Sequence, residues 1–145
     1  MEIKPTYVSL EQAKKLKEKG FNEPCDSIFN KDGEFQSYKN VGDIRTHFKN
    51  NEPINPKTWH RYDTSAPEQW QVVEWLRVNH GIWINVEADS YGELWYSKLC
   101  VCSKKVWENL EVRSKIINSY RHLGEHNSPQ EAYSSAFDYI LKELI

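Results

Sequence analysis

The sequence lacks the features that mark membrane, secreted and DNA-binding proteins. No stretch of its 145 residues approaches the ~20 consecutive apolar residues that a membrane-spanning helix requires. Its first residues lack the basic start and apolar block of a secretory signal, so we expect the protein to stay in the cytoplasm. The formal net charge is −2, which disfavours binding to nucleic acid or an anionic membrane through a generic basic surface.

Cysteine is scarce as well. Cys25, Cys100 and Cys102 make an odd number, and the last two lie too close together on one strand face to form an easy disulfide. We therefore expect reduced thiols. A lone Cys-x-Cys also lacks the paired spacing that makes a zinc signature specific, so we expect no bound metal.

The common catalytic motifs are missing too. The chain has no Walker loop, no dinucleotide glycine fingerprint, no His-Glu-x-x-His and no Gly-x-Ser-x-Gly elbow. Its five histidines are scattered along the sequence. We expect a protein that is not an enzyme, with no catalytic residue and no cofactor. An enzyme whose site is assembled from dispersed residues stays an open alternative.

Capping residues and apolar spacing predict three helices. Ser9 begins a capping box, which predicts a helix that starts at Leu10 and stops at Gly20. A capping serine followed by a first-turn proline occurs twice more, and predicts helices over 66–80 and 129–144. The last of these has an apolar stripe that indicates an amphipathic helix docked on the core.

Other patterns predict strands. An Asp-Gly step between apolar residues predicts a two-stranded ribbon within 25–38. Apolar residues at every second position predict an antiparallel pair formed by 82–86 and 94–102. The segment 103–124 allows two interpretations. Its apolar residues could line a helix, while 115–121 could equally add a short strand.

Together these elements predict an α+β fold in a single globular domain, 1–145. We expect a small antiparallel β-sheet, built from the 82–102 pair, with about three α-helices packed against it. The helices at 66–80 and 129–144 should pack on one face of that sheet. The segment 41–63 reads as a long, mostly irregular connection.

The unusual feature of the composition is its aromatic content, with six tryptophans and eight tyrosines. Six tryptophans are more than one small core usually needs, so we expect some of them at the surface. The structural alternative is that a second layer or the long connection covers these rings. The residues that we predict to bind a ligand are Trp59, His60, Arg61, Tyr62, Trp83 and Trp95.

The segment 59–63 is the centre of this predicted site. It precedes the predicted helix start at Ala66, where free amides and the positive end of the helix dipole favour an anion. Arg61 adds a fixed charge with a planar fork, while Trp59 and Tyr62 offer rings for stacking. The structural alternative is that the two rings only pin the long connection to the core.

Three segments of the chain, Ser9 to Gly20, Ala66 to Ile82 and Ser128 onward, resemble small uncharacterised proteins of phages and prophages of Bacteroides and related gut bacteria. The resemblance covers about half of the chain and implies a phage origin and a bacterial host. It implies no activity and transfers no site residue. Cys25 to Thr64 and Val101 to Asn127 match the group poorly, so a function particular to this protein is expected there.

We therefore expect a non-enzymatic binding protein of a phage or prophage that acts on a component of its bacterial host. One version holds a nucleotide-like molecule, such as a defence signal, in an aromatic and Arg-lined pocket. The alternatives are contact with a host protein, an accessory role in phage assembly, and a small enzyme. Association with a second copy of the chain stays open. A closed polar pocket would favour a small ligand, and a flat exposed aromatic patch would favour a protein partner.

Overall fold

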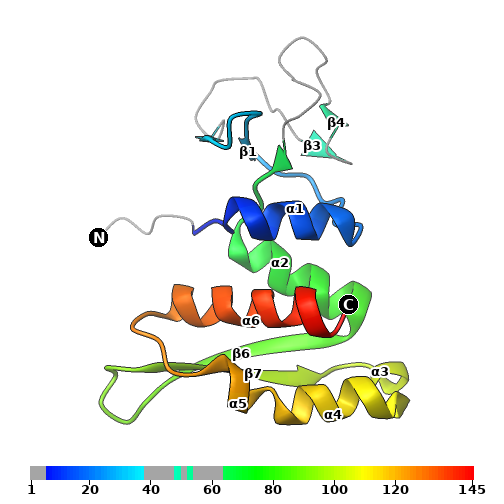
Figure 1. Cartoon of the computed structure of the whole chain (residues 1–145), viewed down its shortest axis with the longest axis vertical. Helices are drawn as coiled ribbons and strands as arrows, with labels where there is room; N and C mark the ends of the chain where they lie inside the picture. The colour runs from blue at the N-terminus through cyan, green and yellow to red at the C-terminus, as the bar shows by residue number, and fades with distance from the viewer. Residues whose placement is uncertain (1–5, 38–47, 50–51, 54–63) are drawn as a thin grey trace. The chain divides into compact units, whose positions relative to one another are not determined.

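The computed structural model describes residues 6–37, 48–49, 52–53 and 64–145, and its fold is α+β (Figure 1). The single domain predicted for the chain contains two compact units, Met1–Gln71 and Val72–Ile145. We describe each unit by itself. In the described ranges, no helix is both long and apolar enough to cross a membrane.

The first unit begins with helix α1, Leu10–Glu18, and its start confirms the predicted capping box. The Gln12 amide donates to the Ser9 hydroxyl oxygen over 3.2 Å, and the Gln12 side chain accepts from the Ser9 amide over 3.2 Å. Two amides that the first turn leaves unpaired are thereby satisfied. The helix buries Leu16 on the side that faces the core of this unit.

The predicted ribbon is also confirmed. Strand β1, Ser27–Phe29, pairs antiparallel with β2, Phe35–Ser37. A third strand, β5, Thr64–Ser65, pairs with the free edge of β1 and completes a sheet of order β2-β1-β5. A separate short pair consists of β3, Phe48–Lys49, and β4, Glu52–Pro53.

Helix α2, Gln69–Trp75, begins three residues later than the sequence predicts. Ser65 does not cap this helix, because it is held in β5 opposite Ile28, and the next amide, of Ala66, donates to the Ser27 carbonyl. Strand pairing keeps the backbone extended through the expected start, so tertiary contacts override the local capping signal. The Glu68 amide instead donates to the Gln71 side chain over 2.9 Å.

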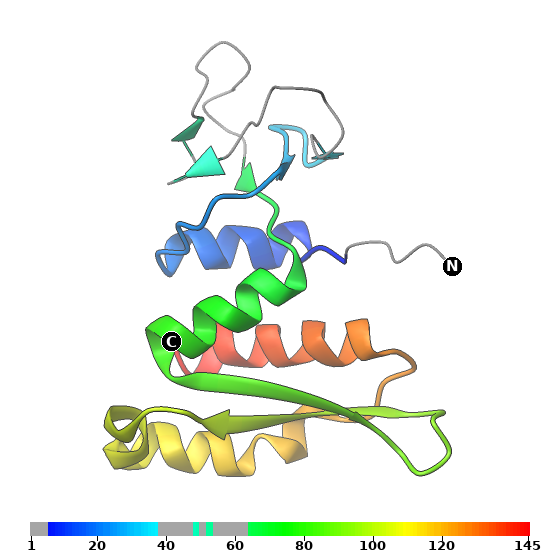
Figure 2. The same cartoon turned by 180° about the vertical axis from the view of Figure 1, so that it is seen from behind.

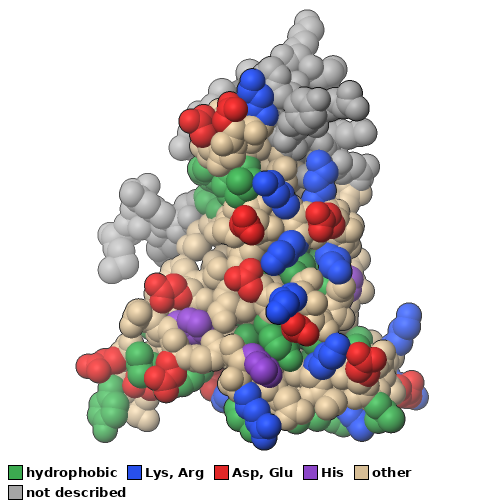
Figure 3. All heavy atoms as spheres, in the orientation of Figure 1, with side chains coloured by type: hydrophobic (Ala, Val, Ile, Leu, Met, Phe, Trp, Pro, Cys, Tyr) green, Lys and Arg blue, Asp and Glu red, His purple; other side chains and the backbone are tan. Residues whose placement is uncertain are grey.

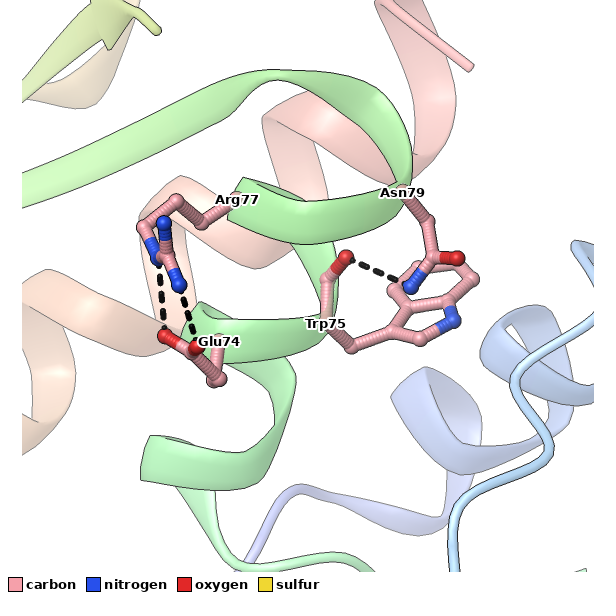
Figure 4. A network of polar contacts seen from close by, with 4 residues as sticks. All are labelled: Glu74, Trp75, Arg77 and Asn79. Atoms are coloured by element: carbon pink, nitrogen blue, oxygen red, sulfur yellow. Dashed lines mark hydrogen bonds and ion pairs between the residues drawn. The ribbon is translucent and has the colours of Figure 1, made fainter.

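Beyond Trp75 the helix widens into a π-helical turn, η1, Leu76–His80. Figure 4 shows the polar contacts on its two sides. Arg77 donates to both carboxylate oxygens of Glu74 on one side, and on the other the side-chain amide of Asn79 donates to the Trp75 carbonyl over 3.1 Å. The turn ends at Gly81, whose φ of 66° is the left-handed conformation that favours glycine.

The second unit is built on the predicted antiparallel pair, now observed as β6, Ile82–Ala88, and β7, Trp95–Val101. The predicted C-terminal helix is α6, Pro129–Glu143, and Ser128 caps it by accepting from the Glu131 amide. Figures 1 and 2 show α6 lying alongside this pair, and it contacts both strands. The fully buried side chains that α6 and β6 contribute to this core include Ile82, Ile84, Phe137 and Ile140.

The segment 103–124 is helical, which excludes the short strand considered for 115–121. It forms α3, Lys104–Glu108, α4, Leu110–Asn118, and α5, Tyr120–Leu123. These helices follow β7 and contact it (Figure 2). Ile116 and Leu123 of these helices are buried in the core, whereas several of their other apolar side chains are exposed to solvent.

Candidate functional site

The structure describes two of the six predicted ligand-binding residues. Trp59, His60, Arg61 and Tyr62 lie outside the described residues. Trp83 is 37% exposed on β6, and Trp95 is half-buried on β7.

The structure does not bring Trp83 and Trp95 together. Trp83 pairs with Cys100, and Trp95 pairs with Ala88 at the far end of the same ladder. Because side chains alternate between the faces of a sheet, this register puts the two rings on opposite faces. Trp95 shares the face of Ile84, as the alternation predicts. Either tryptophan could belong to a binding surface, but the two cannot line one pocket as neighbours.

The outer face of the β6–β7 pair is polar around Trp83. It carries Asn85 and Glu87 from β6 and Lys98 from β7. Glu87 accepts hydrogen bonds from Lys98 and Asn85, and the bond from Lys98 lowers the pKa of this carboxyl below its ordinary value. The charge of Lys98 is thus already matched by a carboxylate, and this face offers little attraction to an anionic ligand.

A different exposed patch stands out on α3, α4 and α5. It holds four large apolar or aromatic side chains with exposed fractions of 53% for Trp107, 68% for Leu110, 58% for Ile117 and 62% for Tyr120. Figure 3 shows hydrophobic and basic side chains next to each other along the edge formed by these helices. We define the α3–α5 surface as Trp107, Leu110, Arg113, Ile117, Tyr120 and Arg121.

Each aromatic ring of the α3–α5 surface lies under an arginine. The guanidinium carbon of Arg113 is 5.0 Å from the centroid of the Trp107 ring, and that of Arg121 is 5.6 Å from the Tyr120 ring. Such cation–π contacts contribute about 0.5–1 kcal/mol each at exposed sites. Arg121 also donates its Nε–H to the Tyr120 hydroxyl over 3.1 Å. These contacts therefore favour one arrangement of the rings and the charges before any partner binds.

Sequence reasoning missed this surface although the signal for it was present. Helix α4 is apolar on two sides, because Ile116 faces the core while Leu110 and Ile117, seven residues apart, face solvent. A helix that only docks on a core needs one apolar stripe. Because α4 has two apolar stripes, the periodicity of 103–124 did not distinguish a helix from a strand. The apolar residues beyond those that the core needs are the ones exposed at the surface.

The second unit also contains a groove of about 840 Å³ between α4 and α6. Its lining residues are polar or charged types, and several of them contact one another. The Tyr139 hydroxyl donates to the Lys115 carbonyl over 3.0 Å, and the Lys115 ammonium donates to the Glu143 carbonyl over 3.2 Å. His122 stacks on Tyr139, with ring centroids 5.7 Å apart. Burial raises the pKa of Tyr139, with Glu143 adding to it, so the phenol stays a donor. These contacts connect α4 and α5 to α6 along the groove.

The thiols differ in environment. Cys25 is buried, and its burial together with the charge of Asp26 raises the pKa of its thiol to about 12. Cys100 and Cys102 are exposed. Among the described residues, no three His, Cys, Asp or Glu side chains are grouped closely enough to hold a metal ion. A thiol with such a raised pKa is a poor nucleophile and belongs to the core.

Comparison with known proteins assigns no family to this geometry. No protein-family model, no curated protein and no solved structure matches the chain. The resemblance to phage proteins stays a prediction from the sequence.

Proposed function

We propose that this chain is a non-enzymatic binding protein that acts by docking its α3–α5 surface on a protein partner. The observation that carries the proposal is the pair of arginines stacked on exposed Trp107 and Tyr120 beside exposed Leu110 and Ile117. Trp, Tyr and Arg are the residue types that contribute most to the affinity of protein interfaces. Following the resemblance of the sequence, the partner is a component of the bacterial host of a phage or prophage.

The arrangement of these side chains favours binding. Association costs conformational entropy for every long side chain that it immobilises. Arg113 and Arg121 already rest on rings, and all six side chains belong to short helices packed along β7. These side chains therefore lose less conformational entropy on binding than free side chains would, which favours tight association.

A protein partner fits this surface better than a small molecule does. Small ligands bind in concave sites that bury most of their area. Leu110 and Ile117 lie on the solvent side of α4, away from Ile116 and the core, so a ligand there would be covered on one side only. Sequestration of a nucleotide-like molecule by 59–62 stays the alternative function predicted from the sequence.

A photo-cross-linking experiment in the bacterial host tests the proposal. A benzoylphenylalanine at Ile117 should cross-link to one discrete host protein. The matched control is the same reagent at Tyr91, which is 88% exposed in the β6–β7 turn, and it should not give that product. Addition of Leu110→Asp should abolish the product while far-ultraviolet circular dichroism stays unchanged. The same products from both positions, or none from Ile117, would contradict the proposal.

The alternative has its own test. The double variant Arg61→Ala with Tyr62→Ala should reduce affinity for the partner or ligand at least tenfold, about 1.4 kcal/mol, if 59–63 forms part of the site. Unchanged affinity in a folded variant removes that segment from the site.

A further inference from the structure

The charges around the α3–α5 surface are strongly asymmetric. Between residues 103 and 124 the sequence has five Lys and Arg against two Glu, an excess of three positive charges in a chain whose net charge is −2. Both glutamates pair with lysines, as Lys104 with Glu108 over 3.6 Å and Lys115 with Glu111 over 3.1 Å. In the described part of the chain, neither Arg113 nor Arg121 has a carboxylate partner.

The two arginines remain able to bind carboxylates. A guanidinium carries five N–H donors, and the contacts seen here use one from each arginine, Arg113 to the Trp107 carbonyl and Arg121 to the Tyr120 hydroxyl. Each therefore keeps donors for a fork-like bond to an incoming carboxylate. Arg113 lies on α4 and Arg121 on α5, eight residues further along the sequence.

The apolar residues of α4 lie on one side together with Arg113. Leu110 and Ile117 are two helical turns apart, and Arg113 lies between them on the same side, while Tyr120 and Arg121 follow on α5. An apolar side flanked by arginines fits a second helix that carries apolar residues on one side and carboxylates next to them. We infer that the α3–α5 surface binds an acidic amphipathic helix of a different protein, an inference that rests on the proposed function.

Charge favours this occupant over a second copy of the chain. Two α3–α5 surfaces facing each other would bring the same unpaired positive charges together without carboxylates between them. A nucleic acid would match the charge but would leave Leu110 and Ile117 without apolar contacts, since phosphates and sugars offer none of comparable size.

Fluorescence anisotropy with designed helical peptides tests the inference. The probe has leucines along one side and glutamates flanking them, and matched peptides carry glutamine or lysine in place of each glutamate. The glutamate peptide should bind the full-length protein about tenfold or more tightly than the glutamine peptide at low salt, and added salt should reduce that preference. The double variant Arg113→Gln with Arg121→Gln should remove it.

A charge-matched control is available in the same unit. Arg77→Gln with Lys98→Gln also removes two positive charges, and these lie outside the α3–α5 surface, so the preference should persist. If Arg113→Gln unfolds the protein, Arg121→Gln alone should still reduce the preference, because Arg121 is exposed at the surface.

Several results would overturn the inference. They are equal or undetectable binding of the glutamate and glutamine peptides, tighter binding of a single-stranded oligonucleotide than of the glutamate peptide, and a dimer of the chain that Ile117→Glu dissociates. Cross-linking at Ile117 does not depend on charge. A discrete cross-linked partner without an acidic preference therefore removes this inference and leaves the proposed function standing.

Discussion

The hydroxyl of Tyr139 donates a hydrogen bond of 3.0 Å to the backbone carbonyl of Lys115, and this bond joins the middle of α6 to α4. Helix α4 carries Leu110, Arg113 and Ile117, half of the α3–α5 surface, so this bond helps to set the position of that surface on the second unit.

Tyr139→Phe should therefore destabilise the protein slightly and leave its fold intact. The loss of one neutral hydrogen bond lowers the free energy of unfolding by about 0.5–1.5 kcal/mol. Urea titration followed by circular dichroism measures it. The control is Tyr133→Phe on the same helix, whose ring stacks on Phe137 with centroids 6.3 Å apart. Equal effects of the two substitutions would show that the bond to Lys115 contributes nothing.

Gly81→Ala should be strongly destabilising. A Cβ at this position would lie 2.3 Å from the Cβ of Ser103, and the φ of 66° is itself costly for alanine by about 1–2 kcal/mol. Gly92→Ala isolates the second effect, because its φ is 74° and nothing lies within 4 Å of the added carbon. The Gly81 variant should lose about 1–3 kcal/mol more than the Gly92 variant. Ser103→Gly should restore part of that difference, and failure to do so would contradict the clash.

The three thiols should react in two classes. At pH 8 a disulfide reagent should modify the exposed Cys100 and Cys102 in the folded protein, with Cys102 slowed because burial raises the pKa of its thiol. Cys25 should react only after unfolding, because it is buried and its pKa of about 12 leaves almost no thiolate. Spectrophotometric titration with and without urea counts the thiols, and Cys25→Ser identifies the one that reacts only after unfolding. Three reactive thiols in the folded protein would place Cys25 outside the core. A chelator should leave the melting temperature unchanged.

The stability of the β6–β7 turn should depend on pH through Asp89. Its Oδ1 accepts from the amides of Tyr91, Glu93 and Leu94 at 3.2, 2.8 and 3.3 Å. Burial acts to raise the pKa of this carboxyl, but the backbone bonds, led by that of Glu93, outweigh it and lower the pKa. A depressed pKa means that the stabilisation is present above the unfolded value, about 3.9, and is lost as the pH falls through the folded value.

Asp89→Asn should accordingly lower the melting temperature at pH 7, and the gap to the unsubstituted protein should close as the pH falls below about 4. Glu93→Gln removes a charge from the same turn and is the control for general charge effects. A gap that stays constant from pH 7 to acid would mean that the ionised Asp89 does not organise the turn.

Capping residues and apolar periodicity predicted the helices and strands correctly where tertiary contacts favour the same local structure. Ser9 and Ser128 cap the helices that their local sequences predict, and the alternation through 82–86 indicates a strand whose partner is adjacent in sequence. Ser65 is an equally good capping residue in the sequence, but it pairs with Ile28, which is distant along the chain, and is therefore part of a strand. The residues close to Ser65 in the sequence give no sign of this pairing with Ile28.

The candidate site was harder to predict for a related reason. Aromatic content indicates that some rings are exposed but not which ones, and the alternation places Trp83 and Trp95 on opposite faces rather than in one pocket. Arg113 lies over Trp107 because α3 ends and α4 begins between them, at Asn109. Sequence spacing on a continuous helix would not bring that pair together, so only the structure reveals it.

The exposure of Trp107 has a practical consequence. Trp107, which is 53% exposed, should emit at long wavelength because water relaxes around the excited indole, and the guanidinium above the ring should perturb that emission further. A partner that covers the α3–α5 surface would exclude water from the indole of Trp107 and shift its emission to shorter wavelength. Subtracting the spectrum of a Trp107→Phe variant would separate this signal from the other five tryptophans. Trp107 would thus serve as a label-free optical reporter for binding at the proposed docking surface.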